Sequence, residues 1–244
     1  MEDLPSDERM LKTLNGFRDF NITLVEWETP LLQRLGYPLA PKPDFIFLVP
    51  DDQIQDACDI AKANGLLDSD QPPNYISEHT NKCFRFAFGT PSSQLIFLPL
   101  SWPGIKMEEL VAVENTNLPC SIWTIPIPAF CAAYLRMIMQ EGPESIIRII
   151  ATADLSGVIG YSMFDMSYEG SYMPAPGDDD YVEDEEKDAL ELEKAIDTMK
   201  KWNFIESTEW ARDIMLQLVS GELLYEFLPS KGGMEVSQGQ LTIE

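Results

Sequence analysis

The chain has 244 residues, of which 41 are acidic and 17 are basic, so its formal net charge at pH 7 is −24. This charge argues against duplex nucleic acid or an anionic membrane as the main partner, because neutralising phosphates requires clustered lysine and arginine. Hydrophobic residues make up 45% of the chain, which is enough to build a core without a metal ion or a disulfide.

Cysteine and histidine usage argues against a metal or disulfide scaffold. The four cysteines form no C-x-x-C pair, and His79 is the only histidine. We therefore expect no zinc site, no disulfide framework and no bound cofactor. Unpaired cysteines are typical of a reducing compartment, so we place the protein in the cytoplasm, with the nucleus as the alternative.

The sequence predicts neither an export signal nor a membrane span. The first ten residues are acidic, whereas a secretory signal begins basic and then turns apolar. The longest uncharged stretch, 115–135, is interrupted by Pro119, Pro126 and Pro128. We therefore expect no membrane partner.

In chain order, the first half of the sequence predicts alternating helices and strands. Helices are expected over 8–20, 29–35 and 51–65, and strands over 21–25, 45–49, 83–88, 94–98 and 122–125. Asp51 is expected to cap the third helix. The strands 83–88 and 94–98 are expected to form an antiparallel hairpin, and 67–79 a loop.

The second half predicts helices. They are expected over 129–140, 144–161 and 206–219, and in the later part of 184–202, which follows an acidic strip that begins at residue 178. The resulting fold class is α/β (α+β), a small mixed sheet flanked by helices and followed by a helical C-terminal half. We divide the chain into an α/β region, 1–125, a helical region with an acidic loop, 126–228, and a mobile tail, 229–244.

Three stretches carry a resemblance to a known family. Residues 44–52 read Asp-Phe-Ile-Phe-Leu-Val-Pro-Asp-Asp, the helix over 128–136 follows the sheet, and 153–155 read Ala-Asp-Leu. With the order of the elements from about residue 11 to 161, they resemble the nucleotidyltransferase superfamily, in particular its stand-alone minor and toxin branch. Several uncharacterised fungal proteins are similar to the chain in the same way.

The resemblance implies a magnesium site that this sequence does not complete. Members of the family hold two magnesium ions with three acidic residues on adjacent strands, because the triphosphate must be neutralised. Here Asp44 takes the first position, Ile46 the second, and the third falls near Gln94 or Ile96. One carboxylate of three is too few for this ion.

The family's glycine pair is also missing. It lets the backbone approach phosphate after the first strand, and here Glu26 and Trp27 replace it. A glutamate beside phosphates adds repulsion. The resemblance therefore implies a vestigial cleft marked by Asp44, Glu26, Trp27 and Gln94.

Other motifs leave alternatives open. Asp179, Asp180 and Glu183 resemble the first magnesium motif of class I terpene synthases, but a solvated acidic loop is the simpler interpretation. The stretch 164–172 alternates aromatic and acidic residues, so Asp165 and Tyr168 either line a cleft for a cationic or polar ligand or lie in a loop folded over the helices.

The sequence thus predicts a catalytically silent nucleotidyltransferase-like protein that acts as an intracellular binding or regulatory module. Its negative field favours a basic protein or a cationic small molecule as partner. One alternative is a magnesium-dependent nucleotidyltransferase in which Asp44 and other acids, such as Asp154 or Asp165, rebuild the site. Another is a scaffold that binds a partner through the last two helices.

Overall fold

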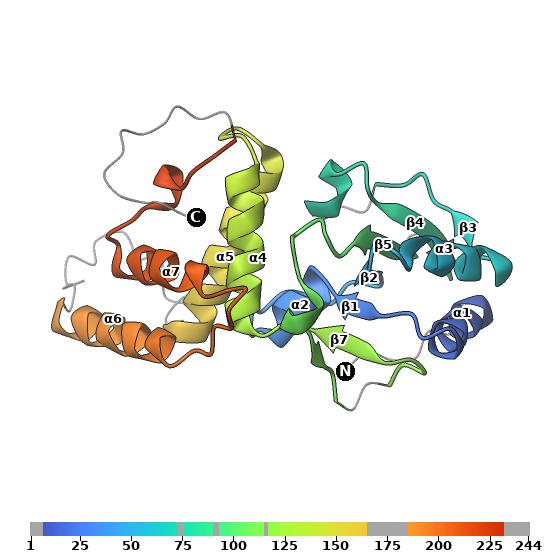
Figure 1. Ribbon diagram of the computed structural model, residues 1–244, viewed down its shortest axis with the longest axis horizontal. Coiled ribbons are helices and arrows are strands. Elements are labelled where there is room, and N and C mark those ends of the chain that lie inside the picture. The colour runs from blue at the N-terminus through green and yellow to red at the C-terminus, as the bar shows by residue number, and fades with distance from the viewer. Residues whose placement is uncertain (1–6, 73–75, 90–92, 115–116, 165–184, 232–244) are drawn as a thin grey trace, which may run out of the picture.

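The computed structural model describes residues 7–72, 76–89, 93–114, 117–164 and 185–231 (Figure 1). The acidic loop up to residue 184 and all but three residues of the predicted tail 229–244 lie outside these ranges. A mixed sheet with its flanking helices forms one half of the molecule, and a group of helices forms the other, as Figure 1 shows. The predicted α/β class with a helical C-terminal half is confirmed.

The helices and strands alternate in the first half and are followed by helices. The α-helices are α1 (Glu8–Asp19), α2 (Thr29–Arg34), α3 (Ile54–Ala63), α4 (Ile127–Gln140), α5 (Ile146–Met163), α6 (Glu185–Lys200) and α7 (Trp210–Ser220). The strands are β1 (Leu24–Glu26), β2 (Phe45–Val49), β3 (Leu67–Asp68), β4 (Phe84–Phe88), β5 (Ser93–Pro99), β6 (Val111–Ala112) and β7 (Ile122–Thr124). Short 3₁₀ helices are η1 (Ile76–His79), η2 (Met107–Glu109) and η4 (Tyr225–Phe227).

The seven strands form one sheet in the order β3-β4-β5-β2-β1-β7-β6. The strand β2 is parallel to β5 and antiparallel to β1, and β1 is parallel to β7. The register aligns Phe45 with Leu95 and Ile46 with Ile96. The predicted hairpin of β4 and β5 is present, with Phe84 opposite Phe97.

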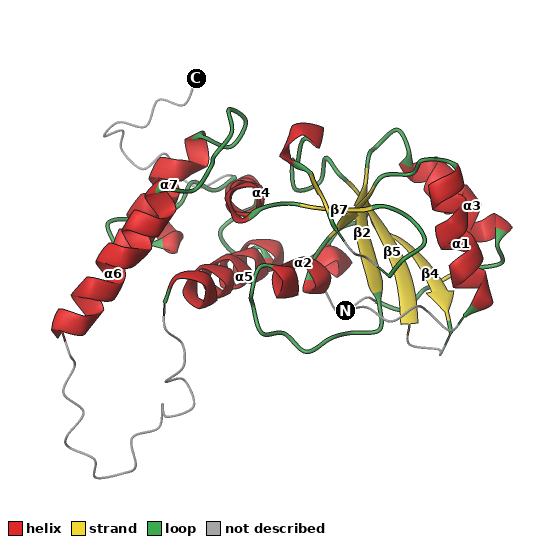
Figure 2. Cartoon of the chain, turned by 90° about the horizontal axis from the view of Figure 1, so that it is seen from below, coloured by secondary structure: helices red, strands yellow, loops and turns green. Residues whose placement is uncertain are grey.

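The two faces of the sheet have separate hydrophobic cores, because successive side chains of a strand point to opposite faces. On one face, Phe45 and Phe47 pack with apolar residues of α1 and α3. On the other, Ile46 and Leu48 join a larger cluster that includes α4, α5 and α7. Figure 2 shows α1 and α3 on one side of the sheet and α2, α4 and α5 on the other.

The helical half is built around α4. Ten of its residues are buried, among them Phe130, Cys131 and Tyr134. It packs against α5 and α7, and Pro128 lies in its first turn. The predicted boundary between residues 125 and 126 falls between β7 and α4, and the larger core cluster contains residues from both sides of it.

Two local predictions are wrong. Asp51 does not cap α3, which begins at Ile54; its carboxylate instead accepts hydrogen bonds from the backbone N–H (3.1 Å) and the hydroxyl (2.6 Å) of Ser101. The segment 67–79 is not all loop, since it contains β3, which pairs with β4, and η1. In both cases a partner distant in the chain supplies the deciding hydrogen bonds.

Among the described helices, α5 alone has the length and apolar composition of a membrane-crossing helix, a property that buried helices of globular proteins share. It packs against α4, α6 and η1. Arg148, in its first half, is 6% exposed and donates hydrogen bonds to backbone carbonyls of the C-terminal segment.

Candidate binding site

The chain leaves β1 through an unusual backbone conformation at Glu28. Its φ of 54° and ψ of −125° lie in a region that glycine favours and that other residues rarely adopt. Glu28 is nevertheless only 3% exposed, and α2 begins at the next residue. The glycine-like backbone conformation after β1 is therefore at Glu28.

Glu28 lines a cavity of about 380 Å³ between α2, the segment before β2, η1 and α5. Its charged lining residues are Glu28, Lys42 and Asp154, which come from the turn before α2, the segment before β2 and the middle of α5. The remaining lining residues are Thr29, Leu32, Leu39, Ala40, Ile76 and Ile150. A mostly apolar cavity with a few convergent charged groups is typical of a small-molecule site.

Burial changes the acidity of both carboxyl groups in the cavity. It raises the pKa of Glu28 to about 8, against the opposing hydrogen bond from the Ser77 backbone N–H (3.1 Å), and the nearby charge of Asp154 adds to the increase. Burial also raises the pKa of Asp154 to about 6, which Lys42 partly counteracts. At neutral pH the cavity therefore holds one protonated and one ionised carboxyl group.

A buried aromatic group adjoins the two acids. The Tyr134 hydroxyl has no hydrogen-bond partner among the described residues, and burial together with the charges of Asp154 and Glu28 raises its pKa. Its ring lies 5.5 Å from that of Trp27, whose indole N–H is also buried without a partner in this part of the chain. Trp27 is thus a core residue, fully buried between Tyr134 and Trp102.

Glu26 forms an ion pair and does not face the cavity. Both of its oxygens accept hydrogen bonds from the Arg34 guanidinium at 2.5 Å, and Glu26 itself is 5% exposed. This arrangement fixes α2 to the end of β1. Because the pair neutralises the buried carboxylate, Glu26 has a structural explanation that requires no ligand.

Asp44 and Gln94 meet across β2 and β5. The Asp44 carboxylate accepts a hydrogen bond of 2.8 Å from the Gln94 backbone N–H. The Gln94 side chain is buried, and its carbonyl oxygen has no partner among the described residues. Neither residue lines the 380 Å³ cavity. The structure therefore brings these two predicted residues together, but outside the cavity that contains Glu28.

The other predicted site residues, Asp165 and Tyr168, lie outside the described residues. Sequence reasoning missed Glu28 and Lys42, and it named Asp154 only as a possible replacement acid. The sequence signal for Glu28 was its position directly before the Thr29-Pro30 start of α2. Within the described ranges, no three His, Cys, Asp or Glu side chains are grouped so that they could hold a metal ion.

Comparison with known proteins gives little similarity. No protein-family model and no curated protein match the chain. Among solved structures, JHP933 from Helicobacter pylori is similar with a TM-score of 0.33 and 16% sequence identity, over 88% of this chain and 90% of that chain.

Proposed function

We propose that the protein is a nucleotidyltransferase-like, catalytically silent binding or regulatory module of the cell interior, and that the cavity between Glu28 and Asp154 is its ligand site. The observation that supports this proposal is the convergence of two acidic side chains, from separate walls, on one cavity of about 380 Å³.

The ligand that suits this cavity is a small organic cation. Asp154 offers a negative charge at neutral pH, which Lys42 partly offsets, and Glu28 offers a second negative charge once it loses its proton. A bound cation favours the ionised form of a nearby carboxyl group and so lowers its pKa. Binding at pH 7 should therefore release a proton from Glu28, whereas a neutral ligand has no such effect.

Isothermal titration calorimetry with 1,4-diaminobutane tests this proposal, and 1,4-butanediol serves as the neutral probe of similar shape. Titration at pH 7 in buffers of different ionisation enthalpy measures the protons released. We expect saturable binding of the diamine with proton release and no binding of the diol. Glu28→Gln should abolish the proton release, and Asp154→Asn should weaken binding.

The matched control is Asp197→Asn, because Asp197 is a half-exposed acid on α6 that pairs with Lys200 (3.4 Å). This variant should bind the diamine as the unmodified protein does. Equal binding by the Asp154→Asn and Asp197→Asn variants, or the absence of binding by the unmodified protein, would contradict the assignment of the cavity as a cation site.

One observation favours the enzymatic alternative. Asp154, which the sequence suggested as a replacement acid, lines the cavity together with Glu28. If these acids hold magnesium with a nucleotide, magnesium and a nucleoside triphosphate should raise the melting temperature, and Asp154→Asn should remove the rise. If the cleft is catalytically silent, none of the four nucleoside triphosphates should shift the melting temperature. A basic protein that contacts the acidic surface remains a proposed partner of the module.

A further inference from the structure

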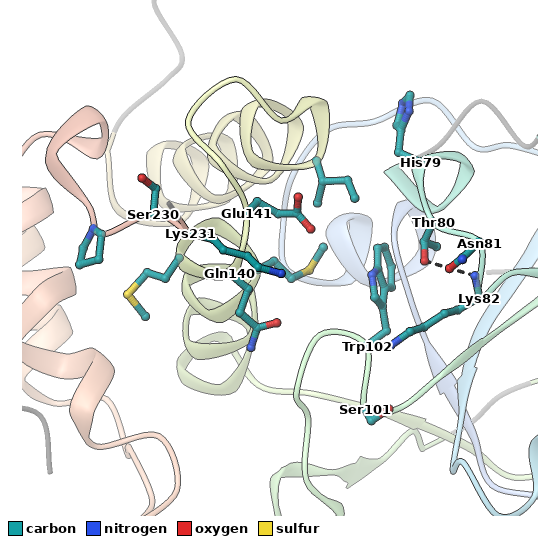
Figure 3. Close-up of a pocket in the computed structure, with 14 residues that line it drawn as sticks. His79, Thr80, Asn81, Lys82, Ser101, Trp102, Gln140, Glu141, Ser230 and Lys231 are labelled. Atoms are coloured by element: carbon teal, nitrogen blue, oxygen red, sulfur yellow. Dashed lines mark hydrogen bonds between the residues drawn. The ribbon is translucent and has the colours of Figure 1, made fainter. Parts of the chain in front are cut away.

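A second and larger cleft, of about 860 Å³, lies between the sheet half and the helical half (Figure 3). Its walls are the residues that follow η1, the turn that follows β5, the end of α4 and the segment 229–231. It is separate from the cavity at Glu28, because the two are lined by opposite ends of η1: Ile76 lines the smaller cavity and His79 the larger cleft.

We propose that this cleft binds a small organic anion, whose charged group lies between Lys82 and Lys231 and whose planar ring packs on Trp102. This inference does not depend on the function proposed for the smaller cavity. It rests on the two lysines, on the fixed position of the indole, and on the hydrogen bonds that hold the wall carrying Lys231.

The two lysines provide the charge. They belong to opposite walls, and in the view of Figure 3 both side chains extend toward Trp102. Neither ammonium group forms an ion pair with a carboxylate of the described residues. In a chain with a net charge of −24, two lysines without such a pair in one cleft form a local site for an anion.

The indole of Trp102 is held in place before any ligand arrives. It packs edge-on against the buried Trp27, with 6.2 Å between ring centroids and an angle of 71°. The turn that carries it is fixed by two hydrogen bonds of Ser101 to Asp51 and by the Arg136 guanidinium, which donates to the Gly104 carbonyl at 2.7 Å. A rigid aromatic ring loses little conformational entropy when a ligand ring packs on it.

The wall that carries Lys231 is also fixed. The Lys231 backbone N–H donates to the Glu141 carbonyl at 3.1 Å. The buried Arg148 donates to the carbonyls of Pro229 (3.0 Å) and Leu228 (2.9 Å). These bonds place the start of the Lys231 side chain beside the end of α4.

The remaining charged residues limit the ligand to a small anion. The Glu141 carboxylate lines the cleft and accepts a hydrogen bond of 2.7 Å from the Ser145 hydroxyl. His79 also lines it, with its imidazole 3.2 Å from the Glu78 carboxylate. Because the negative charge of Glu141 partly offsets the positive charges of the two lysines, a ligand with one phosphate or carboxylate group suits the cleft better than a polyanion.

Titration with 1-naphthyl phosphate, followed by tryptophan fluorescence and calorimetry, tests the inference. Two control ligands separate the contributions: 1-naphthol carries the ring without the phosphate charge, and inorganic phosphate carries the charge without the ring. We expect the naphthyl phosphate to bind more tightly than either. Lys82→Met and Lys231→Met should each weaken its binding about tenfold, the value for one charged hydrogen-bonding group, and leave naphthol unaffected. Glu141→Gln should strengthen its binding.

The control is Lys200→Met, because Lys200 is a well-exposed lysine on α6 that pairs with Asp197. Lys82 and Lys231 are also exposed, so all three variants should fold, and circular dichroism checks this. Equal weakening by Lys200→Met, equal affinity for naphthol and naphthyl phosphate, or no saturable binding of the phosphate would each overturn the proposal. Glu28→Gln should leave naphthyl phosphate binding unchanged, which separates this site from the cation cavity.

Discussion

The carboxylate of Asp44 and the backbone N–H of Gln94 are joined by a hydrogen bond of 2.8 Å between two parallel strands. One oxygen of the Asp44 carboxylate thus closes the end of the β2–β5 pair. This bond gives Asp44 a role in the sheet that needs no metal ion.

Removing this acceptor should destabilise the sheet edge. We expect Asp44→Ala to lower the free energy of unfolding by about 1–2 kcal/mol, because the Gln94 N–H loses its partner at a partly buried position. Asp44→Asn should lower it less, since the amide oxygen still accepts. Urea denaturation measures both. Asp52→Ala, at an exposed position of the next turn, is the control; equal losses in the two alanine variants would refute this role.

Glu28 should make stability depend on pH. Its pKa is about 8 in the folded chain against an ordinary value of 4.5, so between these values the folded state binds more protons than the unfolded state. Stability from this group therefore falls as pH rises through that window. Glu28→Gln removes the effect. Between pH 4.5 and 8.5, the free energy of unfolding of this variant should therefore rise by up to roughly 4 kcal/mol relative to that of the unmodified protein.

Urea denaturation at four pH values across this range measures the difference. Asp154 contributes a slope of the same sign in both proteins, over a window that ends near its pKa of about 6. Glu108→Gln, at an exposed residue of η2, should reproduce the pH profile of the unmodified protein. Parallel profiles for Glu28→Gln and the unmodified protein would show that Glu28 is not buried in a neutral form.

Arg148 should be required for the packing of the C-terminal segment. Its guanidinium donates to the carbonyls of Ile138 (2.6 Å), Leu228 (2.9 Å) and Pro229 (3.0 Å). Arg148→Met leaves these acceptors without donors and should cost about 3 kcal/mol. Limited proteolysis should then cut after residue 224. Arg18→Met, at an exposed arginine paired with Asp19, should change neither property; an uncut segment in Arg148→Met would contradict the prediction.

The four thiols should react slowly in the folded protein. Burial raises the pKa of Cys83 to about 12, raises those of Cys58 and Cys120 to about 11, and raises that of Cys131 further. Since the thiolate is the reactive form, Ellman's reagent at pH 8 should label the native chain far more slowly than the urea-unfolded chain. A thiol that reacts in the native protein as fast as free cysteine would disprove this.

The sequence predicts best where one local pattern decides the structure. The strand 45–49 is bounded by Pro50 and apolar throughout, because both faces of β2 are covered. Likewise, Pro128 suits the first turn of α4, and β4 alternates so that Phe86 and Phe88 face the core. In these segments the local preference and the tertiary environment agree, so the prediction holds.

The sequence predicts poorly where a polar side chain can choose between a local and a distant partner. Asp51 is a good helix cap by position, but it bonds to Ser101 after β5. Glu26 was expected to repel phosphates, and it pairs with Arg34 instead. Sequence alone does not decide such cases, because the partners meet only when the sheet assembles.

The sequence by itself determined the fold class, the strong negative charge and the segments that form the core strands and helices, since these follow from composition and the spacing of apolar residues. Only the tertiary structure decided that Glu28 and Asp154 share one cavity and that Lys82 and Lys231 face each other across another. These residues are far apart in the chain. Their charges therefore act on one another only after packing has brought the sheet and the helices together and excluded most of the water between them.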